Sequence, residues 1–342
     1  MGLHQVAVVG VHGKARESGG AERFYEGLTT GLKNSGVDAE YVGIPCDEST
    51  NETIEEAYLR CYDLDLSAFD GVISTKAPAY AIRHPNHVCY LTHTMRVFYD
   101  MFDFQFPQPS EDMLEARDRF RRLDTALLQH PGLQSRFVIG HEVRNRMLRF
   151  NGLDTTVLYP GLNLDHLRTG EFQHIFLPGR LHRWKRVDLV IQAMKHLNRP
   201  IELLISGEGE HGDHFRQLAD GDDRIHFLGR VSDEELVDLY ANALVVPFAP
   251  IREDYGYIVL EAFQSCKPVI TCSDSGEPAR LVKDGVSGFV CPSDPVQIAS
   301  RMQRLIDDVG LARTMGLEGH VSILDIKWNN VAADLLGALG LP

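Results

Sequence analysis

Apolar runs of strand length alternate with helically spaced apolar residues along most of the chain. Residues 5–11 form a continuous apolar run, and Phe24, Leu28 and Leu32 then recur at helical spacing within residues 21–34. A second apolar run follows, so the chain is predicted to begin as a β-α-β unit. The further predicted elements of this half are strands at 37–44, 71–75, 88–92, 136–140 and 155–159 and a helix at 110–130.

The same alternation restarts after a predicted linker at residues 159–163, which contains the turn-forming pair Pro160-Gly161. The apolar run 174–178 opens this second series. Its further predicted elements are strands at 201–206, 225–228, 243–248 and 268–272 and helices at 186–197, 212–220, 232–242 and 256–265. Each half is therefore predicted to be a doubly wound, Rossmann-like α/β domain with parallel strands and right-handed crossovers, covering residues 1–163 and 164–328.

Composition limits the classes of function. The 342 residues are enough for two ordinary domains, and 44% hydrophobic with 24% charged residues is typical of a soluble globular protein. No apolar stretch reaches 18 residues and the N-terminus lacks the basic segment of a signal peptide, so a cytoplasmic protein is predicted. Six cysteines without a Cys-x-x-Cys pair indicate a reducing compartment, and the net charge of −14 argues against a nucleic-acid partner.

One region departs from the acidic average. The span from Arg117 to Arg149 contains eight arginines against Asp118, Asp124 and Glu142. Two interpretations stay open at this point. The region contacts anionic lipid at the inner membrane face or a phosphorylated acceptor, or it is a salt-bridged helix surface, which is the favoured interpretation.

Two carboxylates, Glu253 and Glu261, are separated by seven residues where a predicted strand passes through a loop into a helix. If that helix begins near Gly256, the free amides of its first turn form an anion site suited to phosphate. Glu253 would then project from the loop, and Glu261 lies one turn after Tyr257, where a carboxylate can accept hydrogen bonds from two vicinal sugar hydroxyls. The alternative from charge alone is a solvated acidic loop with a glutamate on the helix surface.

Charged and small residues also occupy other predicted strand ends. Arg180 and Lys185 lie in a segment that follows a strand and opens a helix, so they are placed to clamp a diphosphate. Gly20 lies at the first strand-to-helix turn, where glycine permits close approach to a phosphate or simply forms a tight turn. His93 follows the predicted strand 88–92, and ligands of open α/β sheets bind at the carboxyl ends of strands.

Three other patterns receive structural interpretations. Residues 207–212 match Gly-x-Gly-x-x-Gly, but Glu208 and Glu210 would repel a pyrophosphate and no acid stands at the ribose-binding spacing, which argues against a dehydrogenase. The Asp-Leu-Asp sequence at 63–65 resembles a metal-binding pair but is predicted to lie on the surface, so no metal site is expected. The aromatic stretch 95–109 is interpreted as core packing rather than as a wall for an acceptor.

Together these motifs resemble the retaining GT-B glycosyltransferases of family 4, the glycosyl transferases group 1. The resemblance is carried by Ser18-Gly-Gly-Ala-Glu-Arg23, Gly179-Arg-Leu-x-x-x-Lys185-Arg, Gly207-x-Gly, Phe227-Leu-Gly-Arg-Val231, Glu253 with Glu261, and Lys267-Pro-Val-Ile270. It covers nearly the whole chain, in order, and is most specific in residues 174–290. It implies two Rossmann-like domains that face a central cleft, with a C-terminal helix at 329–342 joined to the first domain.

The resemblance further implies a nucleotide-sugar donor bound mainly by the second domain, retention of anomeric configuration, no essential metal and no cofactor. By position, Arg180 and Lys185 would hold the donor diphosphate, Glu261 the ribose hydroxyls and the backbone near Val231 the base. Glu253 and His93 are the implied catalytic residues beside the donor sugar. The implied donor-binding set is Gly20, Arg180, Lys185, Val231, Tyr255, Gly256, Tyr257, Ile258 and Glu261.

Two positions depart from the family pattern. Arg280 stands where an acid is usual, and Gly140-His141 replaces an Asn-Ser type of pair, a difference that we relate to the acceptor. The predicted function is transfer of a hexose to a cell-surface glycan or a lipid-linked saccharide. The alternatives are a glycosyltransferase that tailors a soluble small molecule and a non-catalytic nucleotide-sugar-binding or scaffold protein.

Overall fold

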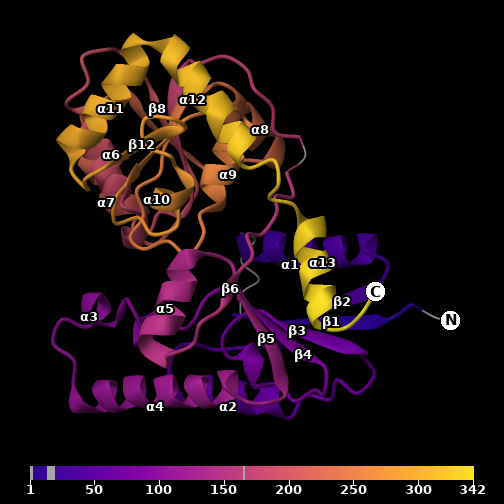
Figure 1. Cartoon of the computed structure of the whole chain (residues 1–342). Helices are drawn as coiled ribbons and strands as arrows, with labels where there is room; N and C mark the ends of the chain where they lie inside the picture. Colours follow the sequence, from indigo (N-terminus) through magenta and orange to yellow (C-terminus); the bar gives the residue numbers. More distant parts are fainter. Residues whose placement is uncertain (1–2, 14–19, 165) are drawn as a thin grey trace. The chain divides into compact units, whose positions relative to one another are not determined.

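The computed structural model describes residues 3–13, 20–164 and 166–342, which form two compact units (Figure 1). Unit 1 contains residues 1–163 and 326–342, and unit 2 contains residues 164–325. Ser18 and Gly19 of the predicted phosphate turn lie outside the described residues. Within the described ranges, no helix combines the length and the apolar character needed to cross a membrane.

Unit 1 is built on a six-stranded parallel sheet in the order β2-β1-β3-β4-β5-β6. The strands are β1 (Gln5–His12), β2 (Asp38–Pro45), β3 (Gly71–Ser74), β4 (His87–Leu91), β5 (Leu133–Val138) and β6 (Thr156–Val157). Val6, Val8 and Val9 of β1 are fully buried, as the continuous apolar run predicts for a strand covered on both faces. The strand order reverses at β1, so the carboxyl ends of β1 and β3 form a topological switch point.

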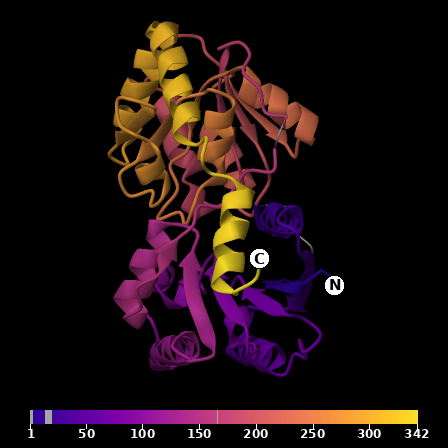
Figure 2. The same ribbon diagram turned by 45° about the vertical axis from the view of Figure 1, so that its right-hand side comes forward.

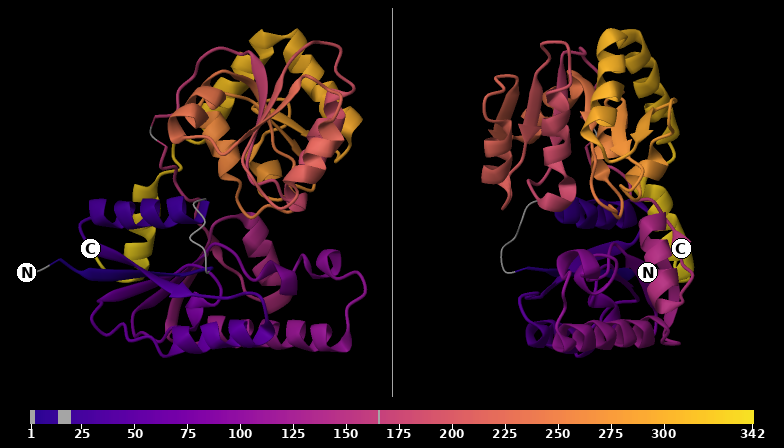
Figure 3. Two further views of the ribbon diagram at one scale, coloured as in Figure 1. Left: turned by 180° about the vertical axis from the view of Figure 1, so that it is seen from behind. Right: turned by 90° about the vertical axis from the view of Figure 1, so that its left-hand side faces the viewer.

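Helices cover both faces of this sheet (Figure 3). They are α1 (Gly20–Asn34), α2 (Asn51–Tyr62), α3 (Phe102–Gln105), α4 (Glu111–Leu128), α5 (His141–Asn151) and α13 (Trp328–Ala338), with 3-10 turns η1 (Ala79–Ala81) and η2 (Arg96–Phe98). Phe24, Leu28 and Leu32 form the buried side of α1, which confirms the helical spacing found in the sequence.

Helix α13 belongs to unit 1, where it packs along α1 (Figure 2). The ring of Trp328 lies 5.4 Å from the ring of Phe24, and Trp328 Nε1 donates a hydrogen bond of 2.5 Å to Asn163 Oδ1. Gly27 of α1 makes this approach possible, because a Cβ atom there would lie 2.1 Å from Trp328 Nε1. The last helix therefore supplies part of the core of a sheet whose strands all precede residue 160.

A carboxylate on α4 is buried in the core of unit 1. Asp124 is 1% exposed and accepts hydrogen bonds from the hydroxyls of Tyr58, Tyr80 and Tyr99, the last at 2.6 Å. Burial raises the pKa of Asp124 to about 6, although the three phenol hydrogen bonds act in the opposite direction. The network joins α2, η1 and the segment after η2 to α4 through one side chain.

Unit 2 repeats the architecture with a second six-stranded parallel sheet, in the order β12-β11-β10-β7-β8-β9. Its strands are β7 (His174–Pro178), β8 (Leu203–Ser206), β9 (Ile225–Gly229), β10 (Ala243–Pro247), β11 (Val269–Cys272) and β12 (Gly288–Cys291). Its helices are η3 (Arg183–Lys185), α6 (Val187–Met194), α7 (Gly212–Ala219), α8 (Asp233–Ala241), α9 (Tyr257–Gln264), α10 (Pro278–Leu281), α11 (Pro295–Asp307) and α12 (Val309–Ser322). The switch point lies between β7 and β10, the strands whose following loops carry Arg180 and Glu253.

The predicted alternation of strands and helices is confirmed, and two predicted strands are wrong in extent. The strand expected at 136–140 is β5 (Leu133–Val138), and Gly140 instead precedes α5 as its N-cap residue. The strand expected at 155–159 has only two residues in β6. Helices α2, α5, α11 and α12 and strand β12 were not predicted. In α5 the apolar residues are too few to stand out, because arginines alternate with them along its sequence.

Candidate functional site

Two loops of unit 2 are packed closely where β7 and β8 end. Leu181 N donates to Glu208 O at 3.0 Å, and His211 N donates to Leu181 O at 3.0 Å. Gly207, at φ +114°, allows this contact because a Cβ atom there would lie 2.1 Å from the oxygen of Gly179. The Gly-x-Gly sequence thus has a structural role in holding the loop that carries Arg180, which agrees with its rejection as a dinucleotide motif.

The start of α9 lies against the first of these loops. A Cβ atom on Gly179 would lie 3.2 Å from Ile258 Cδ1, so the loop after β7 and the first turn of α9 are neighbours. Helix α9 begins at Tyr257 with Gly256 as its N-cap residue, which confirms the predicted helix start. Gly256 has φ +93°, and a Cβ atom there would lie 2.9 Å from Pro278 Cγ, so only glycine fits this position without strain.

Lys185 and Glu253, predicted for different parts of a donor, contact each other directly. Lys185 Nζ lies 2.8 Å from Glu253 Oε1 and 2.7 Å from Oε2, and the two side chains are 27% and 23% exposed. The backbone of Glu253 is fixed as well, because its N–H donates to Ser275 O at 2.8 Å and its oxygen accepts from Glu277 N at 2.9 Å. The structure thus brings a cation and a carboxylate together beside the N-terminus of α9.

Glu261 is buried on α9 and is only 5% exposed. Its Oε2 accepts a hydrogen bond of 2.6 Å from Tyr240 Oη, a residue of α8. The alternative of a solvated glutamate on the helix surface is therefore wrong for this residue. Tyr257, one turn earlier, has a buried hydroxyl without a hydrogen-bond partner in the described chain, and burial followed by the charge of Glu261 raises its pKa.

Arg180 and Arg186, two of the three arginines between β7 and α6, have different environments. Arg180 is 55% exposed, and its Nη2 lies 3.3 Å from Glu210 Oε2. Arg186 instead binds Asp274 through two hydrogen bonds of 2.8 and 2.7 Å and donates to the oxygen of Ala249 at 2.6 Å. Burial acts to raise the pKa of Asp274, but the hydrogen bonds and charge of Arg186 hold it below its ordinary value. Arg186 therefore holds the segment after β7 to the loops that follow β10 and β11, whereas the side chain of Arg180 is more than half exposed.

Two further predicted donor-binding residues of unit 2, Val231 and Tyr255, lie in the segments that follow β9 and β10. Val231 follows β9 and is half-buried, directly before Ser232, the N-cap residue of α8. Tyr255 is buried, and its ring meets the ring of Tyr257 edge-on at 5.1 Å. Arg280, on the short helix α10, is exposed, and nothing in its position explains the departure from the usual acid.

Two predicted residues belong to unit 1. His93 follows β4, is half-buried, and its Nδ1 lies 2.8 Å from Thr94 O. Gly20 is the first residue of α1, directly after the undescribed residues 14–19. The roles of both toward a donor stay predictions from the resemblance. The pair at 63–65 is exposed, with Asp65 Oδ1 accepting from Ser67 N at 3.0 Å, which confirms its surface interpretation.

The arginine-rich region is largely paired within unit 1. Arg146 Nε lies 2.7 Å from Asp100 Oδ1 in a buried ion pair, and Arg119 lies 2.8 Å from Glu55. Arg144 binds Asp154 at 2.8 Å. The exposed pairs of Arg119 and Arg144 support the interpretation as a salt-bridged surface, whereas Arg146 lies in the core, and lipid contact stays a prediction. The aromatic stretch is mainly core, as predicted, because Phe98 and Phe102 are buried, whereas Phe104 is exposed.

Sequence reasoning missed the residues that support the site. Tyr240 precedes Glu261 by 21 positions and Asp274 follows Arg186 by 88, so no local spacing links the partners. His182, Glu210 and His211 gather on the two packed loops and were likewise missed as a group.

Three comparisons with known proteins bear on this site. Residues 165–320 match the family model of glycosyl transferases group 1. The mouse (Mus musculus) alpha-1,3/1,6-mannosyltransferase ALG2 is 28% identical over 211 residues, which cover 53% of this chain and 51% of that protein. The chain thus spans about half the length of this curated relative.

Two solved structures share the fold along nearly the whole chain. Sucrose-phosphate synthase from Thermosynechococcus elongatus superposes with a TM-score of 0.78 at 18% identity and 98% coverage of both chains. Anabaena HepE, solved in complex with UDP-glucose, superposes with a TM-score of 0.72 at 16% identity and covers 98% of this chain and 99% of its own. At these identities the two likenesses establish the fold alone.

Proposed function

Residues 165–320 belong to the glycosyl transferases group 1 family and the chain has the GT-B fold, and from this premise we propose that it is a retaining glycosyltransferase. It transfers a hexose from a nucleotide-sugar donor to a saccharide acceptor. The observation that carries the proposal is the pairing of Lys185 with Glu253, because it joins a cation to a carboxylate in the loop that leads into the first turn of α9.

The diphosphate part of the donor is assigned to Arg180, Lys185 and the first turn of α9. When the bond to the sugar breaks, negative charge develops on the leaving diphosphate, and fixed cations and backbone N–H groups stabilise it. The helix dipole acts in the same direction. Arg186 is left out of this assignment because Asp274 occupies its guanidinium group with two hydrogen bonds.

The nucleoside part is assigned to Glu261 and to the backbone near Val231. A buried carboxylate is costly unless it is hydrogen-bonded, and Tyr240 supplies one such bond to Oε2. Ribose hydroxyls would supply further donors to the same carboxylate. Glu253 is assigned to the sugar, where it orients hydroxyls while the anomeric carbon gains oxocarbenium character.

The reaction is proposed to proceed with retention and without an essential metal, as the resemblance implies. The acceptor is proposed to be a cell-surface glycan or lipid-linked saccharide, and the relative named as a mannosyltransferase supports a saccharide acceptor. Because the arginine-rich region of unit 1 is internally paired, it adds little support for membrane contact. Liposome co-sedimentation tests that part separately, and absence of binding to anionic vesicles would refute peripheral membrane contact.

A thermal-shift screen with UDP, GDP and ADP, followed by a panel of the corresponding nucleotide sugars, tests the proposal. One of the three nucleotides should raise the unfolding temperature, and its sugar should be hydrolysed slowly or transferred. Lys185→Met should remove the shift, whereas Lys195→Met, an exposed lysine at the end of α6, should keep it. Stabilisation by no nucleotide would favour the alternative of a scaffold protein. Stabilisation without any turnover would favour a non-catalytic binding protein.

A further inference from the structure

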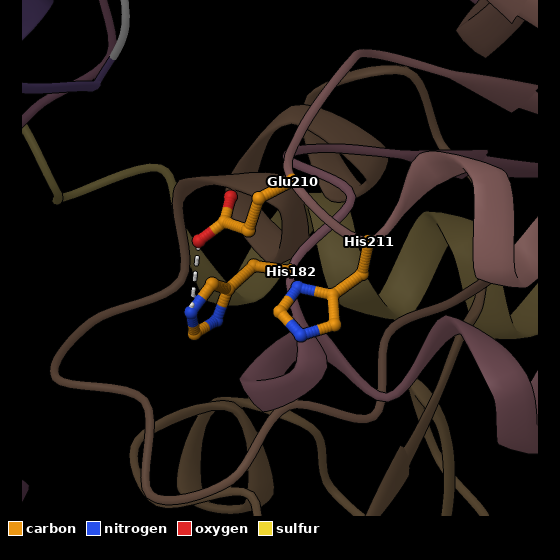
Figure 4. Close-up of side chains that lie close together, drawn as sticks. All are labelled: His182, Glu210 and His211. Carbon is orange, nitrogen blue, oxygen red and sulfur yellow. Dashed lines mark ion pairs between the residues drawn. The ribbon is translucent and has the colours of Figure 1, made fainter.

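We propose that His182, Glu210 and His211 bind one divalent transition-metal cation of the zinc type. The three side chains lie at the ends of β7 and β8, and each offers one ligand atom, with all these atoms within 4.8 Å of one another (Figure 4). Two imidazoles and one carboxylate are a ligand set that zinc uses in proteins. The cation would be separate from the chemistry of transfer, which is assigned to other residues.

The ligands stand on a backbone that is already held in place. Glu210 and His211 follow the Gly207-x-Gly turn, and His182 lies in the loop against which that turn packs. The hydrogen bonds of Leu181 to Glu208 and of His211 to Leu181 fix the two loops to each other at two points. A Cβ atom on Gly209 would lie 2.5 Å from Leu181 O, so the backbones of the two loops are in close contact at this glycine. Such a preformed backbone reduces the ordering that a metal site needs.

The side-chain geometry is close to that of a bound site. The ring centroids of His182 and His211 are 5.4 Å apart with the planes at 80°. Two imidazoles on a tetrahedral zinc ion, with bonds of about 2.1 Å, have ring centroids about 5 Å apart and nitrogens about 3.4 Å apart. The spacing of the two rings is therefore already close to that of a metal-bound pair.

The present polar contacts of these side chains are weak, which favours their replacement by bonds to a metal ion. Glu210 lies 3.3 Å from His182 Nε2 and 3.3 Å from Arg180 Nη2, both beyond the range of strong charge-assisted hydrogen bonds. His211 has a buried Nδ1 without a hydrogen-bond partner in the described chain. A metal ion would give both rings and the carboxylate a strong ligand bond.

Binding has one identifiable cost. His182 Nδ1 accepts a hydrogen bond of 3.1 Å from Trp184 N, which caps the 3-10 turn η3, so the ring proton is on Nε2. A cation needs a nitrogen lone pair and must either take Nδ1 from the Trp184 amide or shift the ring proton to Nδ1. Either change removes the cap from the turn that carries Lys185, so metal binding should alter this turn.

The test is direct metal binding by the full chain after removal of any affinity tag. Zn²⁺ in competition with a chromophoric chelator should bind with one strong equivalent, and Co²⁺ should give the visible absorption of a tetrahedral site. Glu210→Gln and His211→Ala should each weaken Zn²⁺ binding at least tenfold. His226→Ala is the matched control, because His226 also pairs with a carboxylate, Glu202 at 3.6 Å, but belongs to no group of three such ligands in the described chain, and it should leave binding unchanged.

Three results would overturn the proposal. Zn²⁺ binding could be undetectable at 100-fold molar excess of metal, or it could be equal in the wild type, Glu210→Gln and His211→Ala. Zn²⁺ binding could also be lost in the variant Cys266→Ser. Because Cys266 carries a partly exposed thiol, that loss would assign the metal to this cysteine instead. Glu210→Gln is nearly isosteric, and an unchanged unfolding temperature in the absence of metal shows that a loss of binding is not a loss of fold.

Discussion

The ion pair between Lys185 and Glu253 leads to a prediction about nucleotide affinity. In the structure, both carboxylate oxygens of Glu253 lie within 2.8 Å of the ammonium group that is proposed to hold the diphosphate. A diphosphate that binds Lys185 must therefore share the cation with an anion of the protein itself. Glu253→Gln removes that competing charge with almost no change in size, so a nucleoside diphosphate without sugar should bind more tightly.

The magnitude follows from the exposure of the pair. Exposed ion pairs contribute up to about 1 kcal/mol, and breaking a buried pair costs about 3–5 kcal/mol. With side chains 27% and 23% exposed, this pair lies between the two classes. Because the diphosphate need not displace Glu253 completely, we expect a gain of about 1–2 kcal/mol, which corresponds to about 5- to 30-fold tighter binding. Sugar transfer should fall in the same variant, because the amide orients the sugar hydroxyls less strongly than the carboxylate.

Isothermal titration calorimetry with the nucleotide that stabilises the protein measures this effect. The wild type, Glu253→Gln, Lys185→Met and the double variant form a thermodynamic cycle. Lys185→Met should weaken binding, and the double variant should bind like Lys185→Met alone, since the effect of Glu253 acts through that lysine. Glu208→Gln is the control, because Glu208 is an exposed carboxylate of the same sheet edge that pairs with Arg230 at 3.7 Å.

Two results would refute the reasoning. If Glu253→Gln binds the nucleoside diphosphate no more tightly than the wild type, the ion pair does not compete with the ligand. If the gain persists in the background of Lys185→Met, or appears equally in Glu208→Gln, it reflects general electrostatics of an acidic protein and not this contact. In either case the assignment of the diphosphate to Lys185 would have to be withdrawn.

Three further predictions concern the support of the site and the fold. Tyr240→Phe removes the hydrogen bond to the buried carboxylate of Glu261, which is worth about 1.5–3 kcal/mol, and should weaken nucleotide binding about tenfold or more in calorimetry, whereas the exposed Tyr62→Phe should have no effect. The pKa of Asp124 is raised from 3.8 to about 6, so its contribution to stability is full below pH 4 and is lost as the pH rises through 6, by about 3 kcal/mol in total. Asp124→Asn should flatten this part of the pH profile of the unfolding midpoint, and an unchanged profile would show that another group titrates. Gly207→Ala should destabilise unit 2 by about 2 kcal/mol or more because the new Cβ meets a backbone oxygen at 2.1 Å, and Gly221→Ala, with a similar positive φ but open space, should cost about 1 kcal/mol in denaturant unfolding.

The alternation of apolar runs was sufficient to predict the two α/β halves, because buried parallel strands need continuous apolar sequence whatever their partners are. The start of α9 at Gly256 was also predictable, since its signal is local and consists of a glycine before an apolar helix. Helix α5 was not, because its buried side consists of few residues, Val143 and Met147 among them, between arginines. Helical spacing is visible in a sequence only where the apolar face is wide.

The candidate site was predictable as a set of residues but not as a set of contacts. Lys185 and Glu253 were identified separately, from the strand ends on which they lie, and their ion pair depends on how two loops meet 68 positions apart. The burial of Glu261 was likewise invisible, because it results from packing of α9 against neighbours and from the hydroxyl of Tyr240. Charge in a sequence does not reveal exposure, and for this residue it suggested the wrong alternative.

The return of α13 to unit 1 has a consequence for the order in which the protein is made. A ribosome releases the strands of unit 1 first, but the partner of Phe24 on α1, Trp328, emerges only after all of unit 2. Unit 2 ends at residue 325 and has its own core, so it can finish folding while the surface of α1 around Gly27 is still uncovered. Unit 1 is thus completed only after unit 2, and during synthesis the side of α1 around Gly27 stays exposed to water until residue 328 has emerged.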